Sequence, residues 1–129
     1  MERSDALKEV YSNFCRVLAG GDMAGLGQML SRQDGLIVLG TDPQERWEGY
    51  ETVMHVFAIQ AEELGGGLPL APGDPQAFVE GTVGWVEDQV RFNMPDGQEF
   101  GGRMTAVFHQ EDGAWKVVQI HLSFGVPNE

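Results

Sequence analysis

The chain has 129 residues, of which 42% are hydrophobic and 22% charged, a composition typical of one globular domain with one core. Its 8 basic and 20 acidic residues give a formal net charge of -12, which repels phosphate backbones and anionic lipid headgroups. We therefore expect a single domain over residues 1–129 that binds neither nucleic acid nor a membrane.

The first half of the chain predicts three helices and one strand. Apolar residues recur at three- and four-residue spacing over 4–19, after a capping Ser4 and before Gly20-Gly21. Asp22 is expected to begin a second, short helix, and the run LIVLG at 36–40 suits a buried strand. A third helix is expected over residues 50–64, before a glycine- and proline-rich loop that is a candidate rim or lid, or a plain connector.

From Gln76 onward, apolar and polar residues alternate in runs separated by turn residues, which predicts four strands in an antiparallel meander. The strongest turn signals are Asp96-Gly97 and Asp112-Gly113, because Asx-Gly pairs between alternating runs are typical of hairpins. The expected fold class is α+β, a curved antiparallel sheet packed on three N-terminal helices.

Alternation along these strands separates two faces of the sheet. If no bulge shifts the register, one face is almost entirely apolar and covers the helices. The other face carries Trp85, Arg91, Arg103, Thr105, Trp115, His121 and Ser123. Aromatic and arginine residues with interspersed polar groups are typical of protein interfaces, so we expect a homodimer through this face; a solvated face is the alternative.

Asp88 is the one carboxylate that alternation places on the apolar face. A buried carboxylate there could act as a general base, with Tyr50 as a polarising donor. The alternative is that the strand bends and Asp88 reaches solvent. Tyr50 and Trp47 lie where the third helix is expected to begin.

Other catalytic and metal-binding classes find little support in the sequence. The single cysteine, Cys15, lies beside the apolar stripe of the first helix and is expected to be a buried thiol. The three histidines are too dispersed to predict a metal site. The sequence has neither a phosphate-binding loop nor a nucleophile motif, and we expect no cofactor. The charged N-terminus differs from a signal peptide and no run of about 20 apolar residues occurs, so we expect a cytoplasmic protein.

The closing segment carries a distinctive series of residues. It contains Arg103-x-Thr105, His109, Asp112-Gly113-x-Trp115 and His121-x-Ser123-x-Gly125. With the order of elements, this series resembles the SnoaL-like branch of the nuclear transport factor 2-like superfamily, the cystatin-like cone that ketosteroid isomerase shares. It is also similar to the association domain of calcium/calmodulin-dependent protein kinase II.

The resemblance implies a cone with a pocket between the concave sheet face and the helices, and sheets that pair across a dimer. Arginines on the concave face of the kinase association domain bind carboxylates, but the matching positions here are Ala106 and Leu122, which cannot bind an anion. The residues expected to line the pocket are Trp47, Tyr50, Phe92, Met104, Ala106, Phe108 and Leu122.

Three functions are open at this point. The first is a homodimeric pocket protein that binds a small apolar molecule. The second is a small-molecule isomerase, cyclase or dehydratase of the ketosteroid isomerase type, with Asp88 as base. The third is an association module whose cone is filled by side chains.

Overall fold

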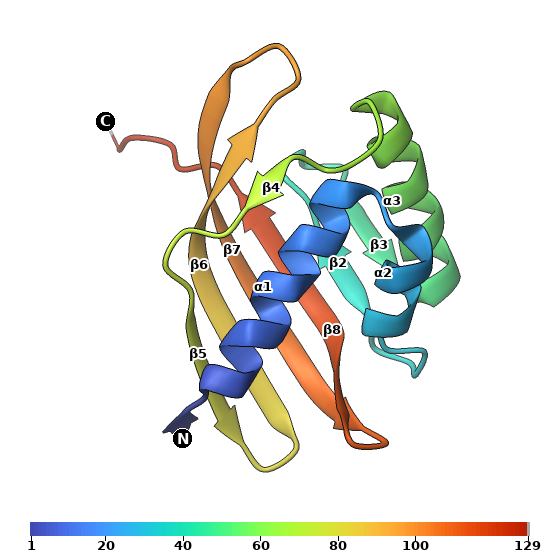
Figure 1. Ribbon diagram of the computed structural model, residues 1–129, viewed down its shortest axis with the longest axis vertical. Coiled ribbons are helices and arrows are strands. Elements are labelled where there is room, and N and C mark those ends of the chain that lie inside the picture. Colours follow the sequence, from blue (N-terminus) through green and yellow to red (C-terminus); the bar gives the residue numbers. More distant parts are fainter. Residues whose placement is uncertain (129) are drawn as a thin grey trace.

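The computed structural model describes residues 1–128, which form three helices against one face of a curved sheet (Figure 1). Helix α1 spans Asp5–Gly20, α2 spans Met23–Met29 and α3 spans Tyr50–Glu63. The Ser4 side chain accepts a hydrogen bond from the Leu7 N–H at 3.0 Å, and Gly21 ends α1 with a left-handed φ of 68°. The predicted helices are confirmed to within a residue or two at their ends.

The sheet contains eight strands, in the order β1-β5-β6-β7-β8-β2-β3, and β4 pairs with β6 beside β5. The strands are β1 (Glu2–Arg3), β2 (Ile37–Leu39), β3 (Arg46–Glu48), β4 (Leu70–Ala71), β5 (Gln76–Glu80), β6 (Val83–Asn93), β7 (Glu99–Glu111) and β8 (Ala114–Ser123). The meander β5–β8 is antiparallel, as predicted, but β2 joins β8 in parallel, so the sheet is mixed.

The predicted register holds along most of the meander and shifts once, near the end. Val107 lies opposite Gln119 and Phe108 lies opposite Val117, so Val118 is an extra residue in β8. This bulge turns Val117 toward the helices, where it is fully buried. Trp115 therefore packs against the core, and not beside His121 on the outer face as unbroken alternation predicts.

Helix α1 crosses the concave face of the sheet and, with α3, covers the core (Figure 1). The β6–β7 hairpin extends beyond the end of α1, and the loop after α3 passes beside it. We call the end of the sheet that carries the β6–β7 hairpin the open end of the cone, and the opposite end, with the β5–β6 and β7–β8 turns, the closed end. None of the helices within residues 1–128 is long and apolar enough to span a membrane.

Candidate functional site

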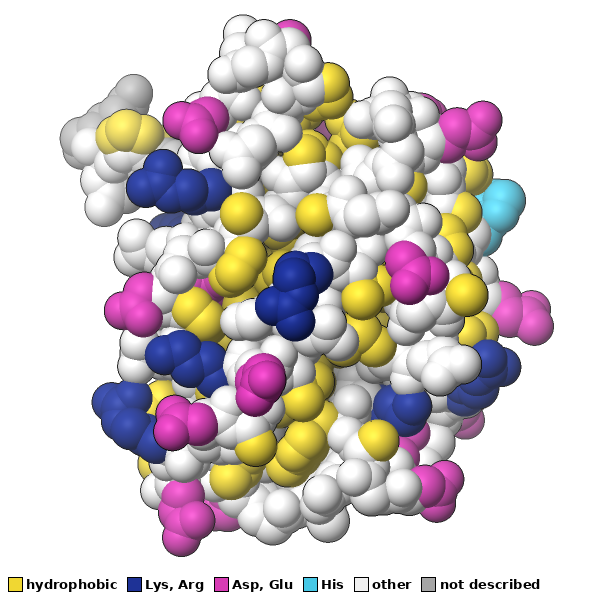
Figure 2. Space-filling model, in the orientation of Figure 1, with side chains coloured by type: hydrophobic (Ala, Val, Ile, Leu, Met, Phe, Trp, Pro, Cys, Tyr) yellow, Lys and Arg dark blue, Asp and Glu magenta, His cyan; other side chains and the backbone are white. Residues whose placement is uncertain are grey.

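A cavity of about 360 Å³ occupies the open end of the cone. Its walls come from the C-terminal ends of α1 and α3, the turn between β2 and β3, the loop before β4, and the outer parts of β6, β7 and β8. The lining is mainly apolar and includes Phe14, Leu18, Val38, Trp47, Phe57, Leu68, Leu70, Phe92, Met104, Ile120 and Leu122. In Figure 2, hydrophobic side chains are visible at this end, between the β6–β7 hairpin and the end of α3.

The structure brings four of the seven residues expected in the pocket to this cavity. They are Trp47, Phe92, Met104 and Leu122. Ala106 and Phe108 are fully buried in the core toward the closed end and do not line the cavity. Alternation assigns a residue to a face of the sheet, but not to a depth along the cone, and these two lie too deep.

Three phenylalanines lie together at the mouth of the cavity. The rings of Phe92 and Phe124 meet edge to face with centroids 5.4 Å apart, and Phe100 lies 6.4 Å from Phe124. Phe100 and Phe124 remain 44% and 46% exposed. Phe100 was absent from the sequence-based candidates, because its neighbours at the hairpin tip have no clear alternating pattern.

Tyr50 lies away from the cavity lining, at the start of α3. Its hydroxyl donates to the Gly27 carbonyl oxygen at 3.0 Å and accepts a hydrogen bond from Arg32 at 2.9 Å. The Arg32 guanidinium also lies over the Tyr50 ring, 4.2 Å from its centroid. These contacts connect α2 and α3, so the geometry gives Tyr50 a packing role rather than that of a donor to a ligand.

Asp88 faces the helices, as alternation predicts, and is only 1% exposed. Its Oδ2 accepts a hydrogen bond from the Tyr11 hydroxyl at 2.8 Å, and the Gly73 N–H donates to the carboxylate at 3.1 Å. Asp88 does not line the cavity at the open end of the cone. A general base must reach the proton that it abstracts, and the Asp88 oxygens are instead occupied by two donors of the protein.

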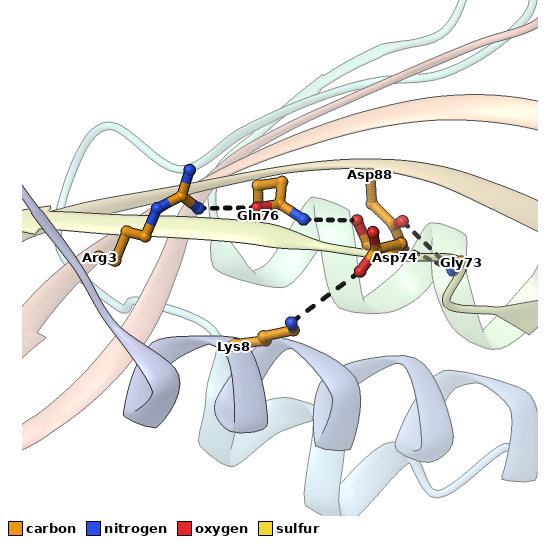
Figure 3. Close-up of polar contacts among 6 residues, drawn as sticks. All are labelled: Arg3, Lys8, Gly73, Asp74, Gln76 and Asp88. Atoms are coloured by element: carbon orange, nitrogen blue, oxygen red, sulfur yellow. Dashed lines mark hydrogen bonds and ion pairs between the residues drawn. The ribbon is translucent and has the colours of Figure 1, made fainter.

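The position of Asp88 follows from an interruption in the sheet. Between β4 and β5 the chain leaves the edge of β6 for a few residues and returns (Figure 3). Gly73 comes so close to the β6 backbone that a Cβ there would collide with the Gln89 carbonyl oxygen. Around the break, Lys8 lies 4.0 Å from the Asp74 carboxylate, and the Gln76 amide donates to the Asp74 carbonyl oxygen at 3.3 Å. The Asp88 carboxylate thus replaces the missing strand partner for the Gly73 N–H.

Cys15 and Tyr11 lie next to Asp88 in the core, and both are fully buried. Burial raises the pKa of the Cys15 thiol to about 12. Burial likewise raises the pKa of the Tyr11 phenol well above its usual range, with the Cys15 and Asp88 charges acting in the same direction. At neutral pH the Cys15 thiol is therefore not a nucleophile, and the Tyr11 hydroxyl keeps the proton that it donates to Asp88.

The outer face of the sheet carries six of the seven residues expected at an interface. Arg103, Thr105, His121 and Ser123 line one depression on this face. Trp85 stacks on Phe78, with ring centroids 6.3 Å apart. Arg91 continues the same face along β6. Trp115, which the bulge turns inward, is the exception.

The part of the chain that the structure describes contains no group of three or more His, Cys, Asp or Glu side chains that could hold a metal ion. The cavity at the open end of the cone is lined mainly by apolar side chains. Its polar groups are confined to the turn between β2 and β3 and to α3.

The family model of the SnoaL-like domain matches residues 7–127. The chain belongs to the SnoaL-like domain family. Comparison with curated proteins found no match to this sequence.

Solved structures share the fold of this SnoaL-like chain at low sequence identity. A nuclear transport factor 2-like protein of unknown function from Pseudomonas putida superposes with a TM-score of 0.82 at 14% identity, covering 95% of this chain and 87% of that chain. A protein from Parabacteroides distasonis, provisionally named a ketosteroid isomerase, gives 0.74 at 19% identity, with 98% and 96% covered. A Xanthomonas campestris protein, provisionally named a calcium/calmodulin-dependent protein kinase II association domain, gives 0.72 at 12%, with 97% and 95% covered. At these identities the matches establish the cystatin-like fold of the SnoaL-like chain and nothing about its ligand.

Proposed function

We propose that the protein binds a small, largely apolar molecule in the cavity at the open end of its cone. The observation that supports this function is the cavity itself, about 360 Å³ in volume and lined mainly by aromatic and aliphatic side chains. This volume lies within the range of about 300–1,000 Å³ that is typical of small-molecule sites. An apolar ligand that enters such a space gains free energy from the surface removed from water.

The two alternatives receive less support from the geometry. An isomerase with Asp88 as base and Tyr50 as donor needs both groups at the ligand, and neither lines the cavity. An association module with a filled cone needs side chains in the space at the open end, which is instead a cavity. Binding is therefore the function that the arrangement of residues supports best.

Binding can be tested with N-phenyl-1-naphthylamine, a neutral fluorophore whose emission rises in apolar surroundings. Leu122→Trp places a large side chain in the cavity and should abolish binding. Ile59→Trp adds the same ring on the exposed side of α3, where Ile59 is 43% exposed, and should leave binding unchanged. The proposal is contradicted if the wild-type protein leaves the emission unchanged, or if both variants bind the fluorophore equally. Circular dichroism is used to check that each variant is folded.

We also propose that the outer face of the sheet pairs two copies of the chain. The face combines Trp85, Arg91 and Arg103 with the smaller polar side chains Thr105, His121 and Ser123. Thr105 is exposed near the middle of β7, so Thr105→Arg brings two new charges together across a symmetric pair. Sedimentation equilibrium should show that the wild type is a dimer and that Thr105→Arg is a monomer. The control Thr52→Arg, which alters an exposed residue of α3, should remain a dimer. A monomeric wild type at micromolar concentration refutes this pairing.

A further inference from the structure

The polar part of the cavity has one sign of charge. Glu45 and Glu63 are the ionisable side chains that line it, and Thr41 and Gln60 are the other polar side chains. Within residues 1–128, no lysine, arginine or histidine reaches the lining. An anionic group that enters the cavity would therefore find two carboxylates and no cation to neutralise it.

Glu45 is the one of the two carboxylates that accepts hydrogen bonds from the protein within residues 1–128. Its Oε1 accepts a hydrogen bond from the Asp42 N–H at 3.0 Å, and the Gln60 amide lies 3.5 Å from Oε2. The Glu45 carbonyl oxygen accepts from the Gly40 N–H at 2.9 Å, which closes the turn between β2 and β3. A Cβ at Gly40 would collide with the Glu45 Oε1, so the glycine lets this carboxylate lie over the end of the strand. The side chain is thus held against the cavity wall.

The contacts of Glu45 leave its charge uncompensated. Both donors, a backbone N–H and a side-chain amide, are neutral, and within residues 1–128 no lysine or arginine pairs with the carboxylate. Glu45 also stands two residues before Trp47, a spacing that puts both side chains on one face of an extended segment. An apolar wall and a carboxylate therefore adjoin each other at the mouth.

The surroundings add to the negative potential at this end. Glu63 is the last residue of α3, and neither α3 nor α1 has a basic residue in its last turn. The C-terminal ends of both helices, which carry the negative end of the helix dipole, reach the cavity through Leu64 and Leu18. The whole chain carries a net charge of -12. These contributions have the same sign, so they attract cations and repel anions.

We propose that the cavity selects amphiphilic amines, whose apolar body lies against Trp47 and Leu122 and whose protonated head binds the Glu45 carboxylate. This inference rests on the proposed binding function and specifies the chemical class of the ligand. An ammonium head supplies the positive charge that Glu45 lacks and can also contact the face of the Trp47 ring. A fatty carboxylate of the same length meets like charge at the same position.

Three probes with the same tail and different heads test this selection. Decylamine, decanol and decanoate are titrated at pH 7, each below the concentration at which it forms micelles, by calorimetry and by tryptophan fluorescence, to which Trp47 contributes from the cavity wall. We expect decylamine to bind about tenfold more tightly than decanoate, with decanol between them. Glu45→Gln should bring decylamine to the affinity of decanol.

Glu48→Gln is the matched control, because it removes the same charge from an exposed position of β3 outside the cavity and should keep the preference for the amine. Decanoate binding as tightly as decylamine, or an equal loss of preference in both variants, overturns amine selection while leaving the binding function in place. Failure of all three probes to bind the wild type overturns the binding function as well.

Discussion

The hydrogen bond between Tyr11 and Asp88 makes a quantitative prediction about stability. Tyr11 is fully buried, Asp88 is 1% exposed, and the two oxygens lie 2.8 Å apart. Tyr11→Phe keeps the ring and its packing and removes only the hydroxyl. The carboxylate then retains the Gly73 N–H as donor and loses the other. Since hydrogen bonds to charged groups contribute about 1.5–3 kcal/mol, we expect the free energy of unfolding to fall by about 2 kcal/mol.

Urea denaturation at pH 7, followed by circular dichroism, measures this loss. Tyr50→Phe is the comparison variant. Its hydroxyl donates to the neutral Gly27 carbonyl group and accepts from the exposed Arg32 guanidinium, and the loss of these solvent-accessible bonds should cost about 1 kcal/mol. A double-mutant cycle with Asp88→Ala, which removes the acceptor, isolates the pair, and we expect a coupling energy of about 1–3 kcal/mol. If Tyr11→Phe changes stability by less than about 0.5 kcal/mol, or if the two changes are additive, the bond does not support the core as argued.

Three further predictions concern pH, the break in the sheet edge and the cavity mouth. Because the pKa values of Cys15 and Tyr11 are raised in the folded protein, the unfolded chain loses these two protons at a lower pH than the folded protein does. The free energy of unfolding should therefore keep its full value below about pH 9 and fall as the pH rises toward 12, by up to about 1.4 kcal/mol per pH unit for each group. In Cys15→Ala, the urea concentration at the midpoint of unfolding should depend less on pH between pH 8 and 11 than it does in the wild type. Gly73→Ala should cost more than about 2 kcal/mol in the same assay, because its Cβ meets the β6 backbone, whereas Gly101→Ala, with open space, should cost less than about 1 kcal/mol. Phe124→Ala should weaken binding of N-phenyl-1-naphthylamine with little change in the melting temperature, because this ring is 46% exposed at the mouth; unchanged affinity removes it from the site.

The sequence predicted the elements whose signals are long and local. The meander and its turns follow from alternation and Asx-Gly pairs, and the helices follow from apolar spacing and caps. β1, β3 and β4 have only two or three residues each, too few for a periodic pattern, and only their pairing with other strands defines them as strands.

The candidate site was less predictable, for physical reasons that individual residues show. Trp115 changed faces because Val118 forms a bulge, and a bulge depends on the partner strand. Asp88 faces inward as alternation predicts, yet its contacts come from Tyr11, which lies 77 positions earlier in the chain. Glu45 carries no sequence signal of a site, because its importance depends on the turn that holds it against the cavity.

The two ends of the cone differ in how they should tolerate sequence change. At the closed end, Phe108 and Val117 are fully buried among residues from distant parts of the chain. A change in the volume of either side chain therefore disturbs the packing of several neighbours. At the open end, the mouth is built from turns, a hairpin and helix ends, and Phe100 and Phe124 are partly exposed. We expect substitutions of such exposed side chains to cost little folding free energy while they change the shape and charge of the cavity. A single scaffold of this kind can therefore diverge toward new ligands by mutation at its mouth while its core remains intact.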